Sequence, residues 1–132
     1  IRESGRVVSG KSKTIKIPGK LKNLKAIGWY MPEYGQAQVS MNFTDINSTP
    51  VHIAYDEACR IALSKGTRVT GSELIGMIPL QCLTEAGKYF LRKENRTGDF
   101  CDQDLVAKAV QSLGLDQLAP FYPKERVIEW VL

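Results

Sequence analysis

A row of hydrogen-bonding side chains follows one predicted strand of the sequence. Residues 36–44 alternate strictly between polar and apolar types, which is the period of a β-strand. The polar row consists of Gln38, Ser40, Asn42 and Thr44, and the apolar row of Ala37, Val39, Met41 and Phe43. Each polar member can donate and accept hydrogen bonds, so the row suits recognition of a heterocycle or an amide. None of them is a general base, so the row by itself indicates binding rather than catalysis.

The surroundings of this polar row stay open from the residues alone. If the row faces water, it is the wet side of an antiparallel sheet, which is the usual arrangement. If it faces a second sheet, the same side chains line a polar channel.

The other residues that carry chemistry give weaker signals. The single histidine, His52, lies in a predicted helix with no nucleophile at a recognisable turn. We therefore expect a half-exposed, hydrogen-bonded side chain there. Residues 71–76 have the glycine spacing of a phosphate loop, but Met77 and Ile78 stand where a lysine and a hydroxyl residue are required. One histidine, and cysteines without a CxxC pair, predict no metal site.

Length and composition indicate a globular domain. The chain has 132 residues, of which 43% are hydrophobic and 24% charged, enough to bury a core without disulfides. No apolar run approaches the ~20 residues that span a bilayer, so no membrane partner is expected. Cys59 and Cys82 are predicted core thiols and Cys101 lies in a polar loop, which favours a cytoplasmic protein. The first residues lack an initiator Met and a signal peptide, which suggests a chain cut from something longer.

Positive charge is concentrated at the start of the chain. Residues 1–25 hold eight basic groups and one acidic group, whereas residues 26–132 hold ten basic and thirteen acidic groups. Such a segment could steer an anionic ligand or nucleic acid. A solvated lead-in segment is favoured over a nucleic-acid site, because no aromatic residue is interleaved with the lysines.

The pattern of residues predicts an α+β domain. Residues 5–22, rich in Gly, Ser and Lys, are expected to form a loop or linker. Strands at 26–31 and 36–44 flank a turn and form an antiparallel hairpin. A third strand is expected at 68–75. Helices packed on one face of a small mixed sheet would complete the domain.

Three helices are predicted from apolar residues at helical spacing. Their expected bounds are residues 50–66, 79–94 and 102–114. Ser48 or Thr49 is expected to cap the first helix, and Asp102 the third. The last residues, 126–132, fit either a final strand or a helical turn.

Several blocks of the sequence resemble the glutamate formimidoyltransferase family. The longest is KAIGWYMPEYGQAQVSMNFTD at residues 25–45. The blocks TPVH at 49–52 and RVTGSELIGMIP at 68–79 follow in the order of the family. The blocks LGLD at 113–116 and PFYPKERVIEW at 120–130 resemble its C-terminal end. These blocks cover nearly the whole chain and keep their spacing, so the resemblance is specific.

The resemblance implies the second half of a two-part catalytic unit. The family has two stacked α/β subdomains with a substrate tunnel between their sheets, and residues 25–132 resemble only the C-terminal subdomain. Residues 1–24 would then be a basic lead-in or linker. The catalytic histidine of the family lies in the first subdomain, so no catalytic residue is expected in this chain. The second subdomain is ferredoxin-like, and the chain would hold a partial ββαβ unit plus C-terminal helices.

An activity and partners are implied in the same way. The family transfers the formimino group from N-formimidoyl-L-glutamate to tetrahydrofolate, its co-substrate, in histidine degradation. The implied partners are this small-molecule substrate and the N-terminal formiminotransferase subdomain, on the same or a separate chain. A sheet that lacks one strand would also allow pairing with a second copy in a homodimer.

Site residues follow by matching the family motifs position by position. The implied substrate-binding or folate-binding residues are Gln38, Ser40, Asn42, Asp45, His52, Ser72 and Glu73. Trp29 and Tyr30 are expected in the core rather than stacked on a pterin. The lysines of residues 11–25 could attract a polyglutamate tail or simply be solvated. The competing hypothesis is a stand-alone α+β domain that binds a ligand or protein without catalysis.

Overall fold

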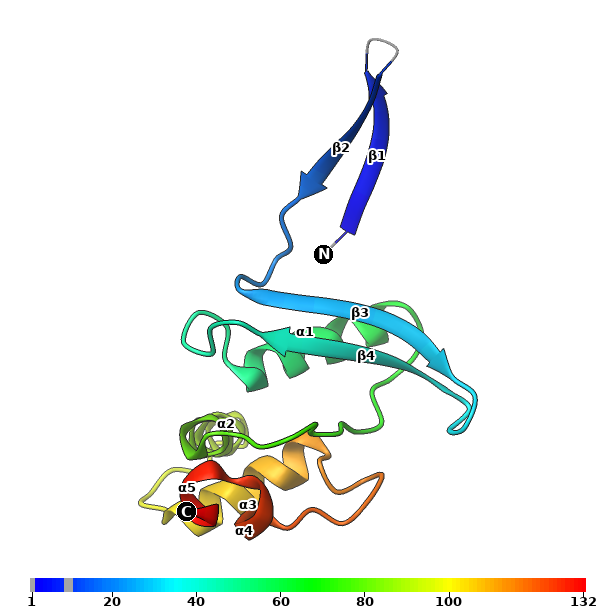
Figure 1. Cartoon of the computed structure of the whole chain (residues 1–132). Helices are drawn as coiled ribbons and strands as arrows, with labels where there is room; N and C mark the ends of the chain where they lie inside the picture. Colours follow the sequence, from blue (N-terminus) through cyan, green and yellow to red (C-terminus); the bar gives the residue numbers. More distant parts are fainter. Residues whose placement is uncertain (1, 9–10) are drawn as a thin grey trace. The chain divides into compact units, whose positions relative to one another are not determined.

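A computed structural model describes the backbone of residues 2–8 and 11–132 and the side chains from residue 17 onward. It contains two compact units, Ile1–Thr49 and Pro50–Leu132 (Figure 1). The strands are β1 Arg2–Val8, β2 Lys11–Ile17, β3 Leu24–Met31 and β4 Gln36–Phe43. The helices are α1 Val51–Ser64, α2 Leu80–Lys93, α3 Asp102–Leu113, α4 Pro123–Arg126 and α5 Ile128–Val131.

Strands β1 and β2 replace the loop predicted for residues 5–22 over residues 5–8 and 11–17, whereas residues 18–22 belong to no strand or helix, as predicted. β1 pairs antiparallel with β2, in a register that runs from Arg2 opposite Ile17 to Val8 opposite Lys11. The glycines and serines of this segment suggested a loop, yet a two-stranded ladder pairs the backbone groups that face the partner strand whatever the side chains are. The basic side chains through Lys16, with the steering role considered for them, lie outside the described residues. The division of the chain between residues 24 and 25 stays a prediction.

The second hairpin confirms the predicted pair of strands. β3 pairs antiparallel with β4, from Leu24 opposite Phe43 to Met31 opposite Gln36. Residues 32–35 form the turn, and Gly35 has a φ of 60° that suits glycine. The register places the side chains of directly opposed residues on the same face of the sheet.

Helix α1 begins where it was predicted, but no side chain caps it. Pro50 holds the N-cap position, and neither expected capping hydroxyl bonds to the helix. The Ser48 hydroxyl instead donates to Asp45, and the Thr49 hydroxyl donates to the carbonyl of Lys22. Gly66 follows the helix with a φ of 76°, as expected for a C-terminal stop.

The strand predicted at 68–75 is wrong. Residues 67–77 belong to no strand or helix, and the only ladder contact described nearby is a parallel bridge between Ile78 and Val127. The Ile78 N–H donates to the Arg126 carbonyl at 2.9 Å, and the Ile128 N–H donates to the Ile78 carbonyl at 3.0 Å. The extended segment therefore meets the C-terminal residues through a single bridge rather than through a strand of a larger sheet.

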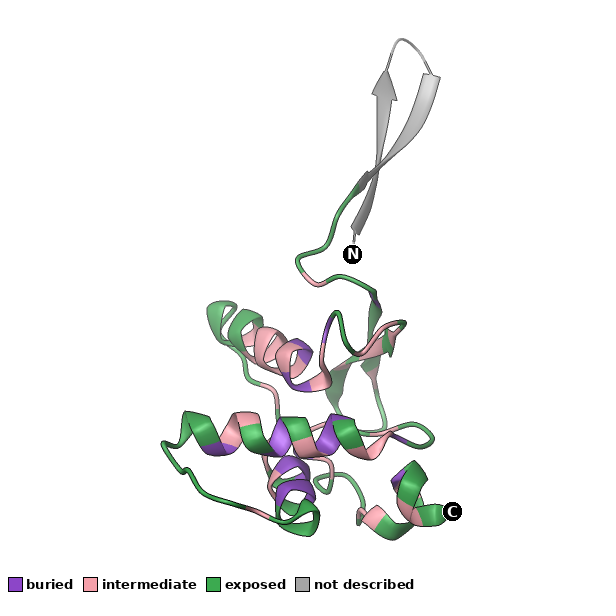
Figure 2. Ribbon diagram, turned by 90° about the vertical axis from the view of Figure 1, so that its left-hand side faces the viewer, coloured by how far each residue is buried: buried purple, intermediate pink, exposed green. Residues whose placement is uncertain are grey.

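Helices α2 and α3 form the best-buried part of the structure. Leu83, Ala86 and Ala109 are fully buried, and Val106 is 1% exposed. The helices approach so closely that a Cβ on Gly87 would lie 2.2 Å from the Leu105 carbonyl oxygen. In Figure 2 the buried residues are concentrated in the helices, as the predicted apolar stripes required.

The N-terminal caps of α2 and α3 differ from the prediction or were not predicted. α3 starts at Asp102 with Cys101 at its N-cap, so Asp102 is not the cap. It is an acidic residue in the first turn, where its negative charge interacts favourably with the positive end of the helix dipole. α2 has no side-chain cap of its own at Pro79. Its first N–H, on Leu80, donates to the Glu129 carboxylate of α5 at 2.7 Å. The C-terminal residues thus form helical turns, the second of the two predicted alternatives.

The α+β class is confirmed, with one correction to the sheet. Both described sheets have two antiparallel strands, in the orders β1–β2 and β3–β4, so the expected mixed sheet is wrong among the described residues. The mixed sheet was expected because of the strand predicted at 68–75. Backbone groups of that segment instead pair with residues near the C-terminus: the Ser72 N–H donates to Gly114, and the Leu74 carbonyl accepts from Arg126.

Candidate functional site

The hairpin β3–β4 places the predicted polar row beside residues from the neighbouring strand. Opposed pairs share a face of an antiparallel sheet. Three such pairs are Trp29 with Gln38, Ile27 with Ser40, and Lys25 with Asn42. We call these six residues the mixed face. It combines amide and hydroxyl groups from β4 with an indole, an aliphatic chain and a cation from β3.

The mixed face is accessible. Asn42 and Lys25 are exposed, and Gln38 and Ser40 are half-buried. Trp29 is 42% exposed and Ile27 is 67% exposed. Large apolar side chains at that level of exposure, interleaved with polar ones, form a surface that can hold a ligand with both characters. The structure therefore brings together three of the predicted site residues, Gln38, Ser40 and Asn42.

Trp29 and Tyr30 correct the sequence analysis. Both were expected in the core, yet Trp29 is 42% and Tyr30 63% exposed. Two strands form this described sheet, so aromatic residues near the end of β3 have few neighbours to cover them. The strand alternation of residues 24–31, with Lys25, Ile27 and Trp29 in one row, was the available signal for a shared face.

The N–H of the Trp29 indole is already hydrogen-bonded, whereas the face of its ring is available for contact. Its Nε1–H already donates to the Met31 sulfur at 2.8 Å. An indole whose N–H is partnered still presents a flat apolar surface for stacking. This makes Trp29 a contact surface rather than a hydrogen-bond donor for a ligand.

Asp45, another predicted site residue, holds the turn that follows β4. Its carboxylate accepts a hydrogen bond from the Ser48 hydroxyl at 2.8 Å and one from the Asn47 N–H at 3.0 Å. The hydroxyl of Ser48, and then the backbone N–H of Asn47, lower the pKa of the Asp45 carboxyl below its usual range. The residue is therefore an ionised turn-forming carboxylate at the end of the hairpin.

His52 is buried, which corrects the half-exposed, hydrogen-bonded side chain expected from the sequence. It is 7% exposed, its ring lies 4.6 Å from the ring of Tyr89, and its Nδ1 has no hydrogen-bond partner among the described residues. Burial lowers the pKa of His52, against the opposing effect of the Glu85 and Asp56 charges. The imidazole is therefore neutral near pH 7 and packed against α2.

The neighbours of His52 form a polar seam between α1 and α2. The Tyr89 hydroxyl and the Lys93 ammonium both donate to the Asp56 carboxylate, the latter at 2.9 Å. Asp56, as the acceptor of its hydrogen bond, raises the pKa of the Tyr89 phenol, and the same carboxylate raises the pKa of Lys93. Both groups keep their protons near neutral pH, so the seam joins two helices and supplies no free base.

Ser72 and Glu73 belong to the extended segment between α1 and α2. The Ser72 hydroxyl donates to the Leu113 carbonyl, and its N–H donates to the Gly114 carbonyl at 3.0 Å. Ser72 therefore anchors the extended segment to the end of α3, whereas Glu73 is exposed. The implied role of Ser72, Glu73 and His52 in binding stays a prediction.

The cysteines and acidic residues provide no metal centre among the residues with described side chains, because no three potential ligands gather there. Cys82 is buried, as predicted, and Cys101 is exposed, whereas Cys59, also expected in the core, is only half-buried. Burial raises the pKa of the Cys82 thiol to about 11, with smaller effects of nearby Glu85 and Glu129. Cys82 therefore remains a protonated thiol in the core.

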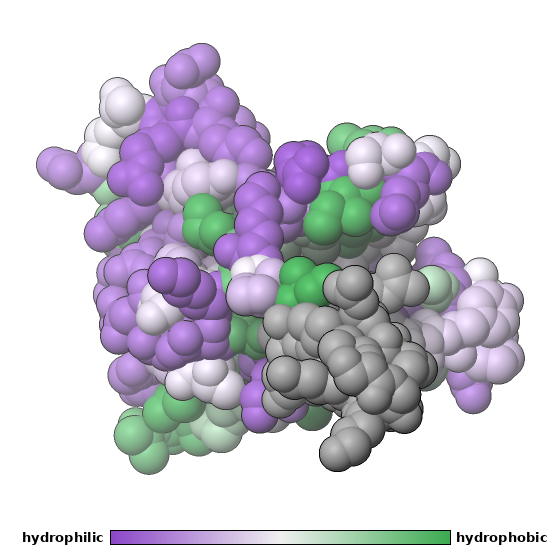
Figure 3. Space-filling view, turned by 90° about the horizontal axis from the view of Figure 1, so that it is seen from above, coloured by the Kyte–Doolittle hydropathy of each residue, from purple (hydrophilic) through white to green (hydrophobic). Residues whose placement is uncertain are grey.

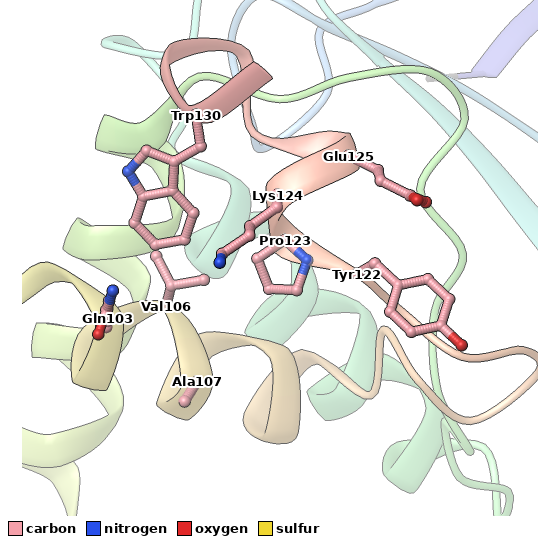
Figure 4. Close-up of a pocket in the computed structure, with 8 residues that line it drawn as sticks. All are labelled: Gln103, Val106, Ala107, Tyr122, Pro123, Lys124, Glu125 and Trp130. Carbon is pink, nitrogen blue, oxygen red and sulfur yellow. The ribbon is translucent and has the colours of Figure 1, made fainter. Parts of the chain in front are cut away.

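An open groove of about 1020 Å³ lies in the helical unit. Figure 4 shows it between α3 and the C-terminal turns, with Trp130 and Tyr122 on opposite sides. Its lining residues are Gln103, Val106, Ala107, Tyr122, Pro123, Lys124, Glu125 and Trp130. None of the predicted site residues lines this groove.

The unit Pro50–Leu132 also has exposed hydrophobic residues of its own. Ile75 is 81% and Leu63 is 70% exposed. Figure 3 shows such hydrophobic side chains in green among hydrophilic ones on one face of the molecule. Among the described residues, every helix is too short or too polar to cross a membrane.

Comparison with known proteins gives one family and several relatives. The sequence profile of the family described as "Formiminotransferase domain" matches residues 1–132. The formimidoyltransferase-cyclodeaminase of Sus scrofa is 42% identical over 132 residues, which are 100% of this chain and 23% of that relative. The protein of the same name from Dictyostelium discoideum is 38% identical over 133 residues, with the same two shares.

A glutamate formimidoyltransferase matches a shorter part of the chain. The glutamate formimidoyltransferase of Thermoplasma acidophilum is 31% identical over 74 residues, which are 56% of this chain and 24% of that relative. The chain thus spans about a quarter of the length of the formimidoyltransferase-cyclodeaminases that it matches.

Proposed function

This chain belongs to the formiminotransferase domain family, and we propose that it is the C-terminal subdomain of a glutamate formimidoyltransferase. In this role it works in the cytoplasm with an N-terminal subdomain, on the same or a separate polypeptide. Together they transfer the formimino group from N-formimidoyl-L-glutamate to tetrahydrofolate. Residues 25–132 form the subdomain and residues 1–24 its basic lead-in.

The observation that carries the proposal is the mixed face of the hairpin. Gln38, Ser40 and Asn42 present amide and hydroxyl groups in one accessible row. Such groups bind and orient both substrates without taking protons from them. Orientation of two reactants supplies a large share of the rate enhancement in a transfer between them.

The division of labour with the N-terminal subdomain follows from the absence of a suitable base on this face. His52 is the single histidine, and it is neutral and packed against Tyr89. The proton-transfer group is therefore expected from the N-terminal half, where the family has its catalytic histidine. Asp45, His52, Ser72 and Glu73 are assigned supporting roles in the complete site.

The hairpin is proposed to become part of a ferredoxin-like sheet in the complete protein. A two-stranded sheet has two open edges and is marginal by itself. Tyr30 and Val39, on the face opposite the mixed face, are 63% and 57% exposed and would be covered by further packing. A second copy of the chain is the alternative source of a pairing strand.

Binding measurements on the whole chain test the proposal. We expect 5-formyltetrahydrofolate, a stable reduced folate, to bind, and Gln38→Ala and Asn42→Ala each to weaken it about five-fold, the equivalent of one hydrogen bond. Calorimetric titration gives the affinity, and thermal unfolding should show a Tm close to that of the parent chain.

The matched control is Gln111→Ala, which removes the same kind of amide from the exposed side of α3. Its affinity for the folate should equal that of the parent chain. Absence of any folate binding by the parent chain would instead favour a non-catalytic protein-binding domain. A second test joins the chain to an N-terminal formiminotransferase subdomain. The joined protein should transfer the formimino group if the proposal holds and should be inactive if it does not.

A further inference from the structure

The mixed face has an order along the strand as well as a composition. On β3 it runs from the cation of Lys25 through the aliphatic Ile27 to the indole of Trp29. A β-strand rises about 3.4 Å per residue, so Lys25 and Trp29 are separated by about 14 Å. The groups opposite them on β4 are Asn42, Ser40 and Gln38.

Tetrahydrofolate has the same order of chemical groups. Its pteridine ring carries hydrogen-bonding nitrogens and a carbonyl, a benzoyl spacer follows, and a glutamate with two carboxylates ends the molecule. A ring with donors and acceptors suits stacking on an indole beside an amide. An apolar spacer suits an aliphatic side chain, and carboxylates suit an ammonium group.

We propose that Trp29 is the stacking surface for the pteridine ring and that Lys25 pairs with the glutamate carboxylate, with Ile27 beneath the benzoyl spacer. This inference rests on the proposed function, because that function names the ligand. It fixes the direction in which the folate lies on the hairpin. It also assigns binding roles to three residues of β3, a strand from which the family motifs supplied no site residue.

The partners of Trp29 and Lys25 support this direction. The Trp29 N–H is held by the Met31 sulfur at 2.8 Å, which orients the ring on the same face of the sheet. Gln38 lies opposite Trp29 and can donate to and accept from the edge of a ring that stacks there. Asn42 lies opposite Lys25 and adds a second hydrogen-bonding group at the carboxylate end.

Fluorescence tests the stacking directly, because the chain has only two tryptophans. In Trp130→Phe, Trp29 is the sole indole, and addition of 5-formyltetrahydrofolate should quench its emission after correction for absorbance. In Trp29→Phe, the remaining Trp130 lies in the groove of the helical unit and should not respond. Quenching of Trp130 instead of Trp29 would overturn the assignment.

Two ligands separate the two ends of the site. Trp29→Leu should weaken 5-formyltetrahydrofolate and 5-formyltetrahydropteroate, which lacks the glutamate, by about ten-fold each, the usual effect of losing an aromatic stacking partner. Lys25→Met should weaken only the ligand that carries the glutamate, by about five-fold, in low salt. The matched control Lys65→Met removes an exposed lysine beyond α1 and should change neither affinity.

The outcomes distinguish this inference from the proposed function. If Gln38→Ala weakens folate binding but Trp29→Leu and Lys25→Met do not, the folate lies on the hairpin in another way and the inference fails alone. If Lys25→Met weakens both ligands equally, the assigned direction is wrong. If the parent chain binds neither ligand, the proposed function fails as well.

Discussion

The hairpin β3–β4 and the helical pair α2–α3 use their side chains in opposite ways. In the hairpin, Ile27, Tyr30 and Val39 are each more than half exposed. In the helical pair, Leu83 and Ala109 are fully buried. Buried apolar residues and exposed side chains are thus separated along this chain. The helices supply the buried apolar surface that favours folding, and the hairpin leaves large side chains exposed to solvent.

The largest effect that this comparison predicts comes from truncating a buried leucine. Leu83→Ala should lower the free energy of unfolding by about 3 kcal/mol, because it loses buried apolar surface and leaves a cavity. Urea unfolding followed by circular dichroism measures the change. Val39→Ala on the hairpin is the control and should cost under about 0.5 kcal/mol, since Val39 is 57% exposed. Equal losses in the two variants would contradict the separation.

Glycine substitutions test the same contrast through the backbone. A Cβ on Gly87 would lie 2.2 Å from the Leu105 carbonyl oxygen, so Gly87→Ala must push α2 and α3 apart. We expect a loss of about 2 kcal/mol in the free energy of unfolding. Gly28→Ala is the hairpin control, because its Cβ would lie 3.7 Å from the Gln38 carbonyl oxygen, an ordinary van der Waals distance. A Gly87→Ala variant as stable as the parent chain would show that the helices are less closely packed.

A smaller effect is expected where α5 completes the start of α2. Glu129→Ala removes the carboxylate that accepts from the Leu80 N–H, and the loss of such a cap costs about 1 kcal/mol. Thermal unfolding should show a lower Tm than the parent chain. Glu125→Ala, the same change on the exposed face of α4, should leave the Tm within error. Equal Tm values for the two variants would remove the capping role.

The smallest predicted effect is a pH dependence that belongs to His52. Burial lowers the pKa of His52 in the folded chain below the value of about 6.5 expected in the unfolded chain. The unfolded chain therefore binds more protons as the pH falls through 6.5, and the free energy of unfolding decreases toward the lower folded pKa. Above pH 6.5 this contribution to stability is fully present.

His52→Phe isolates that contribution, because it removes the single histidine. The difference in unfolding free energy between pH 7.5 and pH 5.5 should be smaller in this variant than in the parent chain. The same difference in both chains would show that the imidazole titrates alike in the folded and unfolded states.

The sequence predicted the strands and helices that are determined by nearby residues in the chain. Strict alternation predicted the hairpin, and apolar spacing predicted α1, α2 and α3 with small errors at their ends. The strand expected at 68–75 failed because its backbone groups pair with distant residues. The Ser72 N–H, for example, bonds to Gly114. The hydrogen-bond partners of Ser72 are some 40 residues away in the sequence, so no local pattern of residues predicts them.

The arrangement of the candidate site was predictable on β4 and not on β3. Alternation identified Gln38, Ser40 and Asn42 as a row, because a two-residue period depends only on the strand itself. The exposure of Trp29 depends on how many strands cover the sheet, so a residue type common in cores gave the wrong expectation. The burial of His52 depends on Tyr89, which belongs to another helix.

Hydrogen–deuterium exchange of the whole chain, with and without 5-formyltetrahydrofolate, tests the separation of stability and binding most directly. We expect the amides of α2 and α3 to exchange slowest in both conditions, because they lie in the best-buried part of the structure. We also expect the ligand to slow exchange in β3 and β4 and to leave α2 and α3 unchanged. Slower exchange in the helical pair, with no change in the hairpin, would contradict this separation.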